Sequence, residues 1–311
     1  MLDLAVQLQH GLAFDTVVSS VCYSWDGKYV ALGTCNSAHV FDAASGRRLF
    51  RFATNKERSA PQHEHFYVRS LCFSPDGQQL VTGSEGQSFK VWNLHSCTLQ
   101  HSLLGHGMDV HCVDVSADNR FIASASTLNY VMLWDLHSGT RLQTLTNKYG
   151  PTDSVSSVAV SPSSQHVAAG SFDNVTRVWD VTANRLTRHF HGHDQQVYDV
   201  AYSPDARLLL SASFDRTINI WDLSMPSSSV SCPITLSGAT DYVLSATFSP
   251  NGHWVIAASR DRHVHIWDLR MMRQSTNFRA HDNSVIQVAH NPTNRSFTSC
   301  SGDCSANIWL Y

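Results

Sequence analysis

The chain has 311 residues, 42% of them hydrophobic, with 22 Lys and Arg against 25 Asp and Glu. This length is sufficient for a substantial buried core, either in one large all-β domain or in two smaller domains. The formal charge of −3 and the absence of long runs of like charge argue against direct binding to nucleic acid or to an acidic membrane, because both need clustered basic residues.

Seven segments in succession end in a strand closed by an aromatic residue. Their spacing of 42–51 residues is close to the roughly 40–45 residues of a WD-repeat unit. Each unit shows two alternating strands and a tight turn before the aromatic strand, so four antiparallel strands per unit are expected. The sequence therefore predicts a single all-β domain over residues 1–311, a seven-bladed WD-repeat β-propeller. The seven aromatics are Phe41, Trp92, Trp134, Trp179, Trp221, Trp267 and Trp309.

The N-terminal segment is expected to close the ring. Residues 2–8 (LDLAVQL) alternate in polarity, and the seventh unit ends at Tyr311, just after its third strand. Residues 2–8 would then supply the missing outer strand and leave no free sheet edge. Longer loops are expected only at residues 55–65 and 224–233. The chain shows no signal peptide and no apolar run of roughly 18 residues, so no membrane span is expected.

A buried hydrogen-bond network is predicted from a fixed offset within the units. His106, His193 and His281 each precede a Trp by the same number of positions, with a Ser and, in two of the three units, an Asp between. The fifth and seventh units have the full set. The third, fourth and sixth units each lack a member, so more reliance on apolar packing is expected there. The two complete networks are His193, Ser211, Asp215 and Trp221, and His281, Ser299, Asp303 and Trp309.

Clusters of His and Cys are candidate metal or catalytic sites. His189 and His191 precede His193 of the network, His263 and His265 share one strand, and Cys300 and Cys304 flank a turn. Ordinary roles within the blades are expected for all of them, with no metal and no cofactor. No catalytic motif of the main hydrolase, nucleotide-binding or metalloprotease types is present, so no enzymatic activity is expected. The scattered cysteines favour a reducing, intracellular environment.

The narrow face of the propeller is the expected binding surface, because loops from every blade converge there around the channel. Positions flanking the first strand of each unit, and the residue before the network Asp, are predicted to point onto it. Aromatic and Arg side chains anchor many protein interfaces, so this face is predicted to bind peptide. Packing between blades is the alternative role for some of the rings. The predicted binding residues are Tyr67, Arg69, Phe172, Tyr198, Phe214, Tyr242, Leu244, Arg260 and Ile286.

Several segments go beyond a generic WD repeat. Residues 65–83 (HFYVRSLCFSPDGQQLVTG), 154–180, 242–250, 281–290 (HDNSVIQVAH) and 301–311 resemble, in the same order, blades of the Tup/Groucho-type transcriptional corepressor propeller. The opening segment, with Phe41 in place of the usual Trp, does so too. The resemblance implies that the matching Tyr67, Arg69, Tyr242, Leu244 and Ile286 bind short hydrophobic motifs, whereas Tyr198, Phe172 and Phe214 follow from geometry only.

The resemblance implies a nuclear, non-catalytic corepressor-like scaffold, present also in the cytoplasm, that binds DNA-bound repressors, with histones or chromatin-modifying complexes as further candidate partners. The family carries an N-terminal helical region that forms tetramers, and no heptad pattern occurs in this sequence. A monomer is therefore expected. The alternative is a generic WD-repeat adaptor, such as a ubiquitin-ligase substrate receptor or an RNA-processing subunit.

Overall fold

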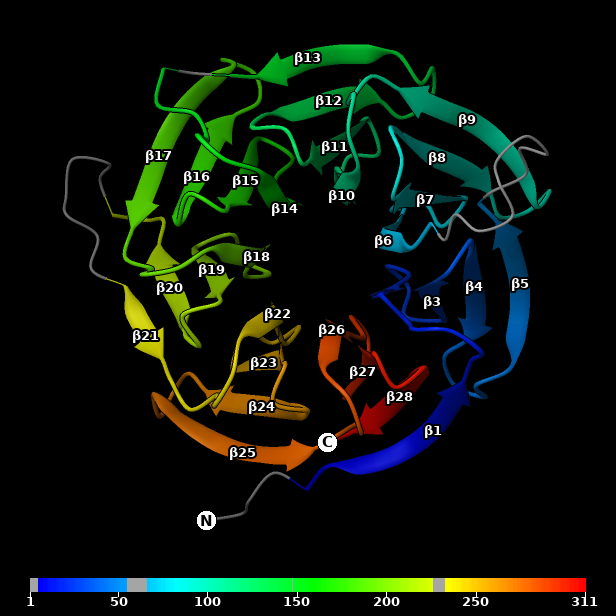
Figure 1. Ribbon diagram of the computed structural model, residues 1–311, viewed down its shortest axis with the longest axis vertical. Coiled ribbons are helices and arrows are strands. Elements are labelled where there is room, and N and C mark those ends of the chain that lie inside the picture. The colour runs from blue at the N-terminus through cyan, green and yellow to red at the C-terminus, as the bar shows by residue number, and fades with distance from the viewer. Residues whose placement is uncertain (1–4, 55–65, 147, 226–232) are drawn as a thin grey trace.

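The computed structural model describes residues 5–54, 66–146, 148–225 and 233–311. These residues form 28 strands, arranged as seven four-stranded antiparallel sheets around a central axis (Figure 1). The seven-bladed propeller predicted from the repeat spacing is confirmed. Of the two expected long loops, residues 55–65 and 226–232 lie outside the described residues. Within the described ranges no helix is long and apolar enough to cross a membrane.

Each blade runs outward from an inner strand beside the axis, and consecutive strands of a blade are neighbours in its sheet. Blade one contains β2 (Ser20–Tyr23), β3 (Tyr29–Thr34), β4 (Ser37–Asp42) and β5 (Arg48–Ala53). Blade two contains β6 (Val68–Phe73), β7 (Gln79–Ser84), β8 (Ser88–Asn93) and β9 (Thr98–Leu104). Blade three contains β10 (Val110–Val115), β11 (Phe121–Ser126), β12 (Val131–Asp135) and β13 (Arg141–Leu145).

The remaining blades repeat this order. Blade four contains β14 (Val155–Val160), β15 (His166–Ser171), β16 (Val175–Asp180) and β17 (Arg185–His191). Blade five contains β18 (Val197–Tyr202), β19 (Leu208–Ser213), β20 (Ile218–Asp222) and β21 (Ile234–Leu236). Blade six contains β22 (Val243–Phe248), β23 (Trp254–Ser259), β24 (His263–Asp268) and β25 (Arg273–Arg279). Blade seven contains β26 (Val285–His290), β27 (Ser296–Ser301), β28 (Ser305–Leu310) and β1 (Gln7–Ala13).

The N-terminal strand closes the ring, but further along the chain than residues 2–8. Strand β1 pairs antiparallel with β28, from Gln7 opposite Leu310 to Ala13 opposite Ser305 (Figure 1). Strand β1 ends at Ala13 and β2 begins at Ser20, a connection similar to that from the end of β25 at Arg279 to the start of β26 at Val285. The alternation of residues 2–8 did not locate this strand. The expected bounds were therefore wrong, and residues 2–4 lie outside the described part.

The core consists of apolar layers between neighbouring blades. One layer joins Ile218 and Leu210 of blade five to Val243 and Trp267 of blade six. The last layer joins Ile308 of blade seven to Val21 of blade one, across the closure. Each blade thus buries its faces against its two neighbours, because a single repeat of this kind cannot bury its hydrophobic faces alone.

Candidate functional site

A β-bulge recurs at the second residue of the inner strand in blades two to seven. In blade five the pairing passes from Val197–Ser213 to Asp199–Ala212, which leaves Tyr198 outside the ladder. A bulged residue has no partner opposite it, so its side chain can be re-aimed. The six bulged residues are Arg69, His111, Ser156, Tyr198, Leu244 and Ile286.

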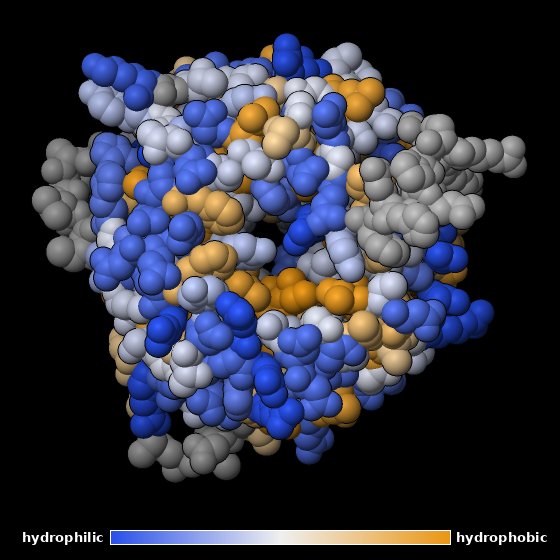
Figure 2. Space-filling view, viewed as in Figure 1, coloured by the Kyte–Doolittle hydropathy of each residue, from blue (hydrophilic) through white to orange (hydrophobic). Residues whose placement is uncertain are grey.

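These six side chains, with Ser19 of blade one, line a cavity of about 140 Å³ at one end of the central channel. Phe172 also lines it. Five of the predicted binding residues are therefore brought together here, each from a different blade. Figure 2 shows hydrophobic surface beside the central opening, over the inner strands of blades six and seven. The mouth of the channel is thus apolar on one side and polar on the other.

A continuous aromatic stack extends outward from this cavity over blades four to six. The ring centroids of Phe172 and Tyr198 are 6.3 Å apart, and those of Tyr198 and Phe214 are 5.1 Å apart. Phe214 in turn stacks on Tyr242 at 4.6 Å. The Arg260 guanidinium lies 5.4 Å from the centre of the Tyr242 ring, as in a cation–π contact. All four rings are half-buried, so each retains an accessible face or edge.

Both arginines of the predicted site have acidic partners. The Arg69 guanidinium forms an ion pair with Glu85, and Arg260 Nε lies 3.8 Å from Asp241 Oδ2. Arg69 nevertheless acts electrostatically on its surroundings at the mouth. Burial lowers the pKa of His111, and the positive charge of Arg69 lowers it further. The two ion pairs largely neutralise the charges of Arg69 and Arg260, and the surface is chiefly aromatic and apolar.

Tyr67 shares the partner Glu85 with Arg69, but its side chain lies outside the aromatic stack. It pairs with Cys35 in an isolated bridge between blades one and two, and its N–H donates to Glu85 at 3.2 Å. Among the described residues it makes no aromatic contact and does not line the cavity at the mouth. A position flanking the inner strand is thus not sufficient to bring a side chain into the stack.

Glu85 and Asp241 were missed as members of this surface. Glu85 follows Ser84, which pairs with Val68 as Ser213 pairs with Val197, so it holds in blade two the place of Phe214. That repeat position therefore carries Phe in blades four and five, Arg in blade six and Glu in blade two. Aligning the blades by this position alone would have predicted the Arg69–Glu85 pair.

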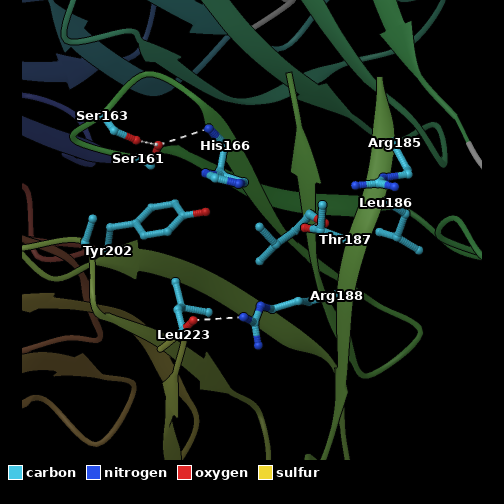
Figure 3. A pocket seen from close by; sticks show the side chains of 11 residues that line it. Ser161, Ser163, His166, Arg185, Leu186, Thr187, Arg188, Tyr202 and Leu223 are labelled. Carbon is cyan, nitrogen blue, oxygen red and sulfur yellow. Dashed lines mark hydrogen bonds between the residues drawn. The ribbon is translucent and has the colours of Figure 1, made fainter. Parts of the chain in front are cut away.

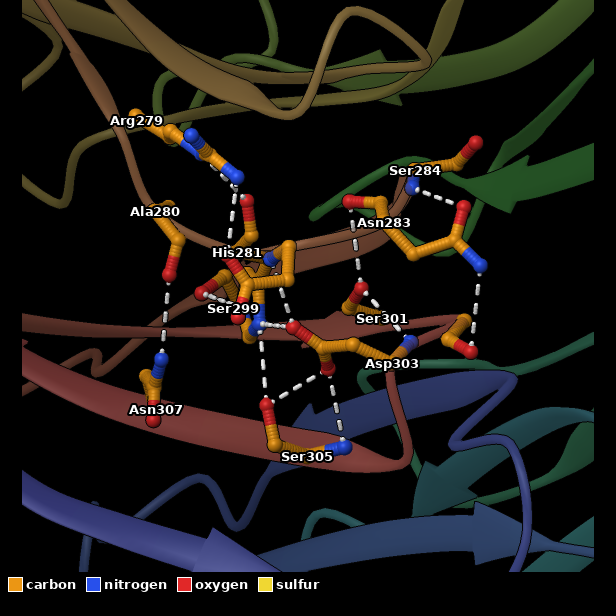
Figure 4. Close-up of polar contacts among 12 residues, drawn as sticks. Arg279, Ala280, His281, Asn283, Ser284, Ser299, Ser301, Asp303, Ser305 and Asn307 are labelled. Atoms are coloured by element: carbon orange, nitrogen blue, oxygen red, sulfur yellow. Dashed lines mark hydrogen bonds and ion pairs between the residues drawn. The ribbon is translucent and has the colours of Figure 1, made fainter.

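Hydrogen bonds join the four residues of each full network. Trp221 Nε1–H donates to Ser211 Oγ at 2.9 Å, Ser211 Oγ lies 2.7 Å from His193 Nε2, and His193 Nδ1 lies 2.7 Å from Asp215 Oδ2. In blade seven Trp309 Nε1–H donates to Ser299 Oγ at 2.9 Å. His281 Nε2 lies 2.7 Å from Ser299 Oγ, and His281 Nδ1 lies 3.0 Å from Asp303 Oδ2 (Figure 4). A neutral imidazole that donates from Nδ1 and accepts at Nε2 satisfies every member. Burial alone would raise the pKa of Asp215, but hydrogen bonds from His193 and Thr217 lower it to about 2.

Blades four and six replace the missing histidine with another cationic or basic side chain. Arg177 Nη1 lies 2.9 Å from the Asp173 carboxylate, and the two side chains are 7% and 9% exposed. In blade six His265 Nε2 lies 3.0 Å from Asp261 Oδ2. The expectation that these two blades rely more on apolar packing is therefore incomplete, because each keeps a buried polar partner for its Asp.

The other His and Cys clusters form no metal site among the described residues, where no group of three or more potential ligands occurs. His193 and His265 each contact an aspartate. The rings of His189 and His191 pack edge to face, with their centroids 5.4 Å apart. Burial raises the pKa of the Cys300 thiol to about 12, so it is not a reactive thiolate.

The repeat architecture has a direct counterpart among protein families. The family described as "WD domain, G-beta repeat" matches residues 56–93, 97–135, 139–180, 184–222, 230–268 and 272–309. The chain belongs to this WD-repeat family. The matches cover β6 to β28, and the unmatched blade one is the blade with Phe41 at the position of the Trp.

Known proteins with similar sequences include transcriptional corepressors. The chain is 41% identical over 109 residues to the general transcriptional corepressor tupA of Dictyostelium discoideum, covering 35% of this chain and 18% of tupA. It is 27% identical over 181 residues to protein groucho of Drosophila melanogaster, covering 57% and 23%. It is also 34% identical over 113 residues to autophagy-related protein 16 of Arabidopsis thaliana, covering 36% and 22%. The matches thus span about a fifth of each relative, and the resemblance to Tup/Groucho propellers is confirmed.

Proposed function

We propose that this chain is a non-catalytic, corepressor-like scaffold that binds short hydrophobic segments of DNA-bound repressors at the channel mouth and aromatic stack. The similarity to tupA and groucho supports the functional class. The observation that carries the site is the stack of Phe172, Tyr198, Phe214 and Tyr242, which ends beside the apolar Leu244 and Ile286. Half-buried rings in a rigid frame are suitable anchors for aromatic or aliphatic side chains.

The proposal assigns distinct roles to the nine predicted residues. Leu244, Ile286 and Phe172 would receive an apolar side chain at the channel mouth, and Tyr198, Phe214 and Tyr242 would cover the segment that follows. Arg260, held by Tyr242 and Asp241, and Arg69, held by Glu85, would donate hydrogen bonds to peptide carbonyls. Tyr67 would bind only a segment that extends as far as blades one and two. Nuclear localisation and further partners such as histones or chromatin-modifying complexes belong to the same proposal, as does a single monomeric domain.

The test compares the wild type with a Phe214→Ala, Tyr242→Ala double variant in affinity capture from the source cell. Trp25→Ala is the control, because Trp25 is 49% exposed and lines the opposite end of the channel. We expect DNA-binding repressors to be captured by the wild type and the control and lost from the double variant, with all three folded by circular dichroism. Capture of repressors that is unchanged in the double variant would show that the site lies elsewhere.

A second candidate is a WD-repeat adaptor outside transcription. The similarity to autophagy-related protein 16 favours it, because the identity of 34% over 113 residues is close to that found with tupA. The same capture experiment separates the two candidates: a partner set without DNA-binding factors, still dependent on Phe214 and Tyr242, would favour the adaptor.

A further inference from the structure

A second cavity lies between blades four and five, at the other end of their inner strands. Tyr198, near the start of β18, lines the channel mouth, whereas Tyr202, at the end of the same strand, lines this second cavity. Its volume is about 550 Å³. Its walls come from the first residues of β15 and β17, from β16, from the end of β18, and from the turns that follow β14, β18 and β20. A ligand here would leave the aromatic stack free.

The lining of this cavity is basic and rich in hydrogen-bond donors. Arg185 and Arg188 extend from β17 on one wall, and His166 and Tyr202 lie across from them (Figure 3). None of the eleven described lining residues is acidic. The rest of the lining contains the hydroxyls of Ser161, Ser163 and Thr187 and the apolar side chains of Val178, Leu186, Ala206 and Leu223.

The cationic groups of the cavity are only partly used by the protein. Arg188 Nη2 donates to the carbonyl oxygen of Leu223 at 2.8 Å, which fixes its guanidinium between the two blades. Within the described ranges the Arg185 guanidinium has no ion-pair partner, and the buried Tyr202 hydroxyl has no hydrogen-bond partner. A buried hydroxyl without a partner is costly, so this wall of the cavity is incompletely satisfied within the protein. Most of the N–H donors of the two arginines are therefore available to a ligand.

We propose that this cavity binds a phosphorylated side chain of a partner protein. A phosphate group offers three acceptor oxygens and about −2 charge, which suits two guanidinium groups and a histidine better than the two oxygens of a carboxylate do. The aliphatic part of the lining, chiefly Leu186 and Leu223, accommodates an apolar neighbour of the modified residue. The chain thus has two separate sites, one for an apolar segment and one for a phosphorylated segment.

The charge of the whole chain favours a single phosphorylated side chain over nucleic acid or an anionic membrane as the ligand. Nucleic acids and anionic membranes are bound by extended basic surfaces, because many phosphates are contacted together. This chain carries a formal charge of −3 and no basic run in its sequence. Hydrogen bonds from Ser224 lower the pKa of Asp222, and the charges of Arg207 and Arg188 lower it further, so an acidic side chain lies near this basic lining. A site confined to one cavity fits one phosphate on a protein segment and does not fit a polyanion.

The test is fluorescence anisotropy with the full chain and labelled five-residue peptides that differ only at the central position. The probes carry phosphoserine, phosphotyrosine, serine or glutamate, each flanked by leucines. We expect binding of a phosphorylated probe and at least about tenfold weaker binding of the serine and glutamate probes. Equal binding of the glutamate probe would overturn the phosphate assignment, and no binding of any probe would overturn the site.

Variants locate the binding. An Arg185→Gln, Arg188→Gln double variant should weaken the phosphorylated probe by about tenfold or more. Its matched control is Arg120→Gln, Arg141→Gln, which removes the same charge from blade three, outside the cavity. Arg185→Gln alone removes no intramolecular bond of the described residues and keeps the test valid if the Arg188 variant fails to fold. Equal binding by Arg185→Gln and its wild type, or equal loss in the control, would overturn the assignment.

Competition with inorganic phosphate distinguishes a site for a phosphorylated peptide from a site for free phosphate. We expect millimolar phosphate to compete only weakly with the phosphorylated peptide, because the leucines add contacts to the aliphatic wall. Inorganic phosphate that binds as tightly as the peptide would overturn the assignment to a protein segment. The Phe214→Ala, Tyr242→Ala variant should bind the phosphorylated probe normally, so failure here is distinguishable from failure of the repressor-binding proposal.

Discussion

Trp179 and Ala169 form a buried pair in which the tryptophan N–H has no acceptor among the described residues. In blades two, three, five and seven the residue ten positions before the Trp is Thr82, Ser124, Ser211 or Ser299, and its hydroxyl accepts the indole N–H at 2.8–3.0 Å. Blade four has alanine at that position. Blade six also has alanine, Ala257, but there Trp267 Nε1–H donates instead to the Ser237 carbonyl at 3.1 Å.

Ala169→Ser should therefore stabilise the protein by about 1 kcal/mol, because it supplies the missing acceptor to a buried donor. The matched control is Ala257→Ser, which adds a hydroxyl beside a Trp that is already satisfied and should bring no gain. Chemical denaturation of the two variants and the wild type measures the difference. Equal changes in both variants would show that the Trp179 N–H is not a source of instability.

The Arg177–Asp173 ion pair should contribute far more to stability than Arg69–Glu85. The side chains of the first pair are 7% and 9% exposed, whereas the Arg69 side chain is 43% exposed. Removing one partner of a buried pair leaves an uncompensated charge, so Arg177→Met should cost about 3 kcal/mol. Arg69→Met should cost less than about 1 kcal/mol. Adding Asp173→Asn to Arg177→Met should recover part of the loss; no recovery would mean that Arg177 stabilises by packing alone.

Protonation of the buried His106 should lower the stability of the folded protein at acidic pH. Burial lowers its pKa to about 4, and its Nδ1 has no partner among the described residues, because Leu128 stands where blade five has Asp215. A histidine with a folded pKa below its unfolded value of about 6.5 favours folding when neutral, so this stability is present above pH ~6.5 and lost as the pH falls toward ~4. We expect a loss of about 1–2 kcal/mol from this group at pH ~5.

Leu128→Asp should reduce that loss, because a carboxylate beside Nδ1 stabilises the protonated ring. Leu128→Asn is the control with a similar shape and no charge. Thermal melts of the three proteins between pH 7 and 4 measure the effect. Identical pH profiles for the Asp and Asn variants would contradict the assignment of the lost stability to His106.

Removal of residues 1–13 should lower Tm by about 5 °C or more, because it deletes β1 and exposes the edge of β28. Deletion of residues 1–4 leaves every described strand pair intact and should have little effect. Differential scanning calorimetry compares the two truncations. A melting temperature unchanged by loss of residues 1–13 would mean that β1 does not hold the ring closed.

The sequence repeat alone predicted the number of blades and the place of the buried networks. Regular spacing of Phe41 and the six tryptophans set the number of blades, and the constant offset between histidine and tryptophan placed His193 near Trp221, since both follow from a local unit repeated along the chain. These features depend on residues close in sequence, where periodicity is readable.

Only the tertiary structure decided how distant segments meet. The register of β1 on β28 joins residues from opposite ends of the chain, so local alternation within one segment does not set it. Bulges turned Tyr198 and Leu244 into the channel mouth, while Tyr67, chosen by the same positional reasoning, lies between blades one and two. Arg177 forms the ion pair with Asp173 in blade four, where the sequence has no histidine to do so. These side-chain positions and strand registers depend on the packing of one blade against the next. The sequence pattern within a single unit does not predict them.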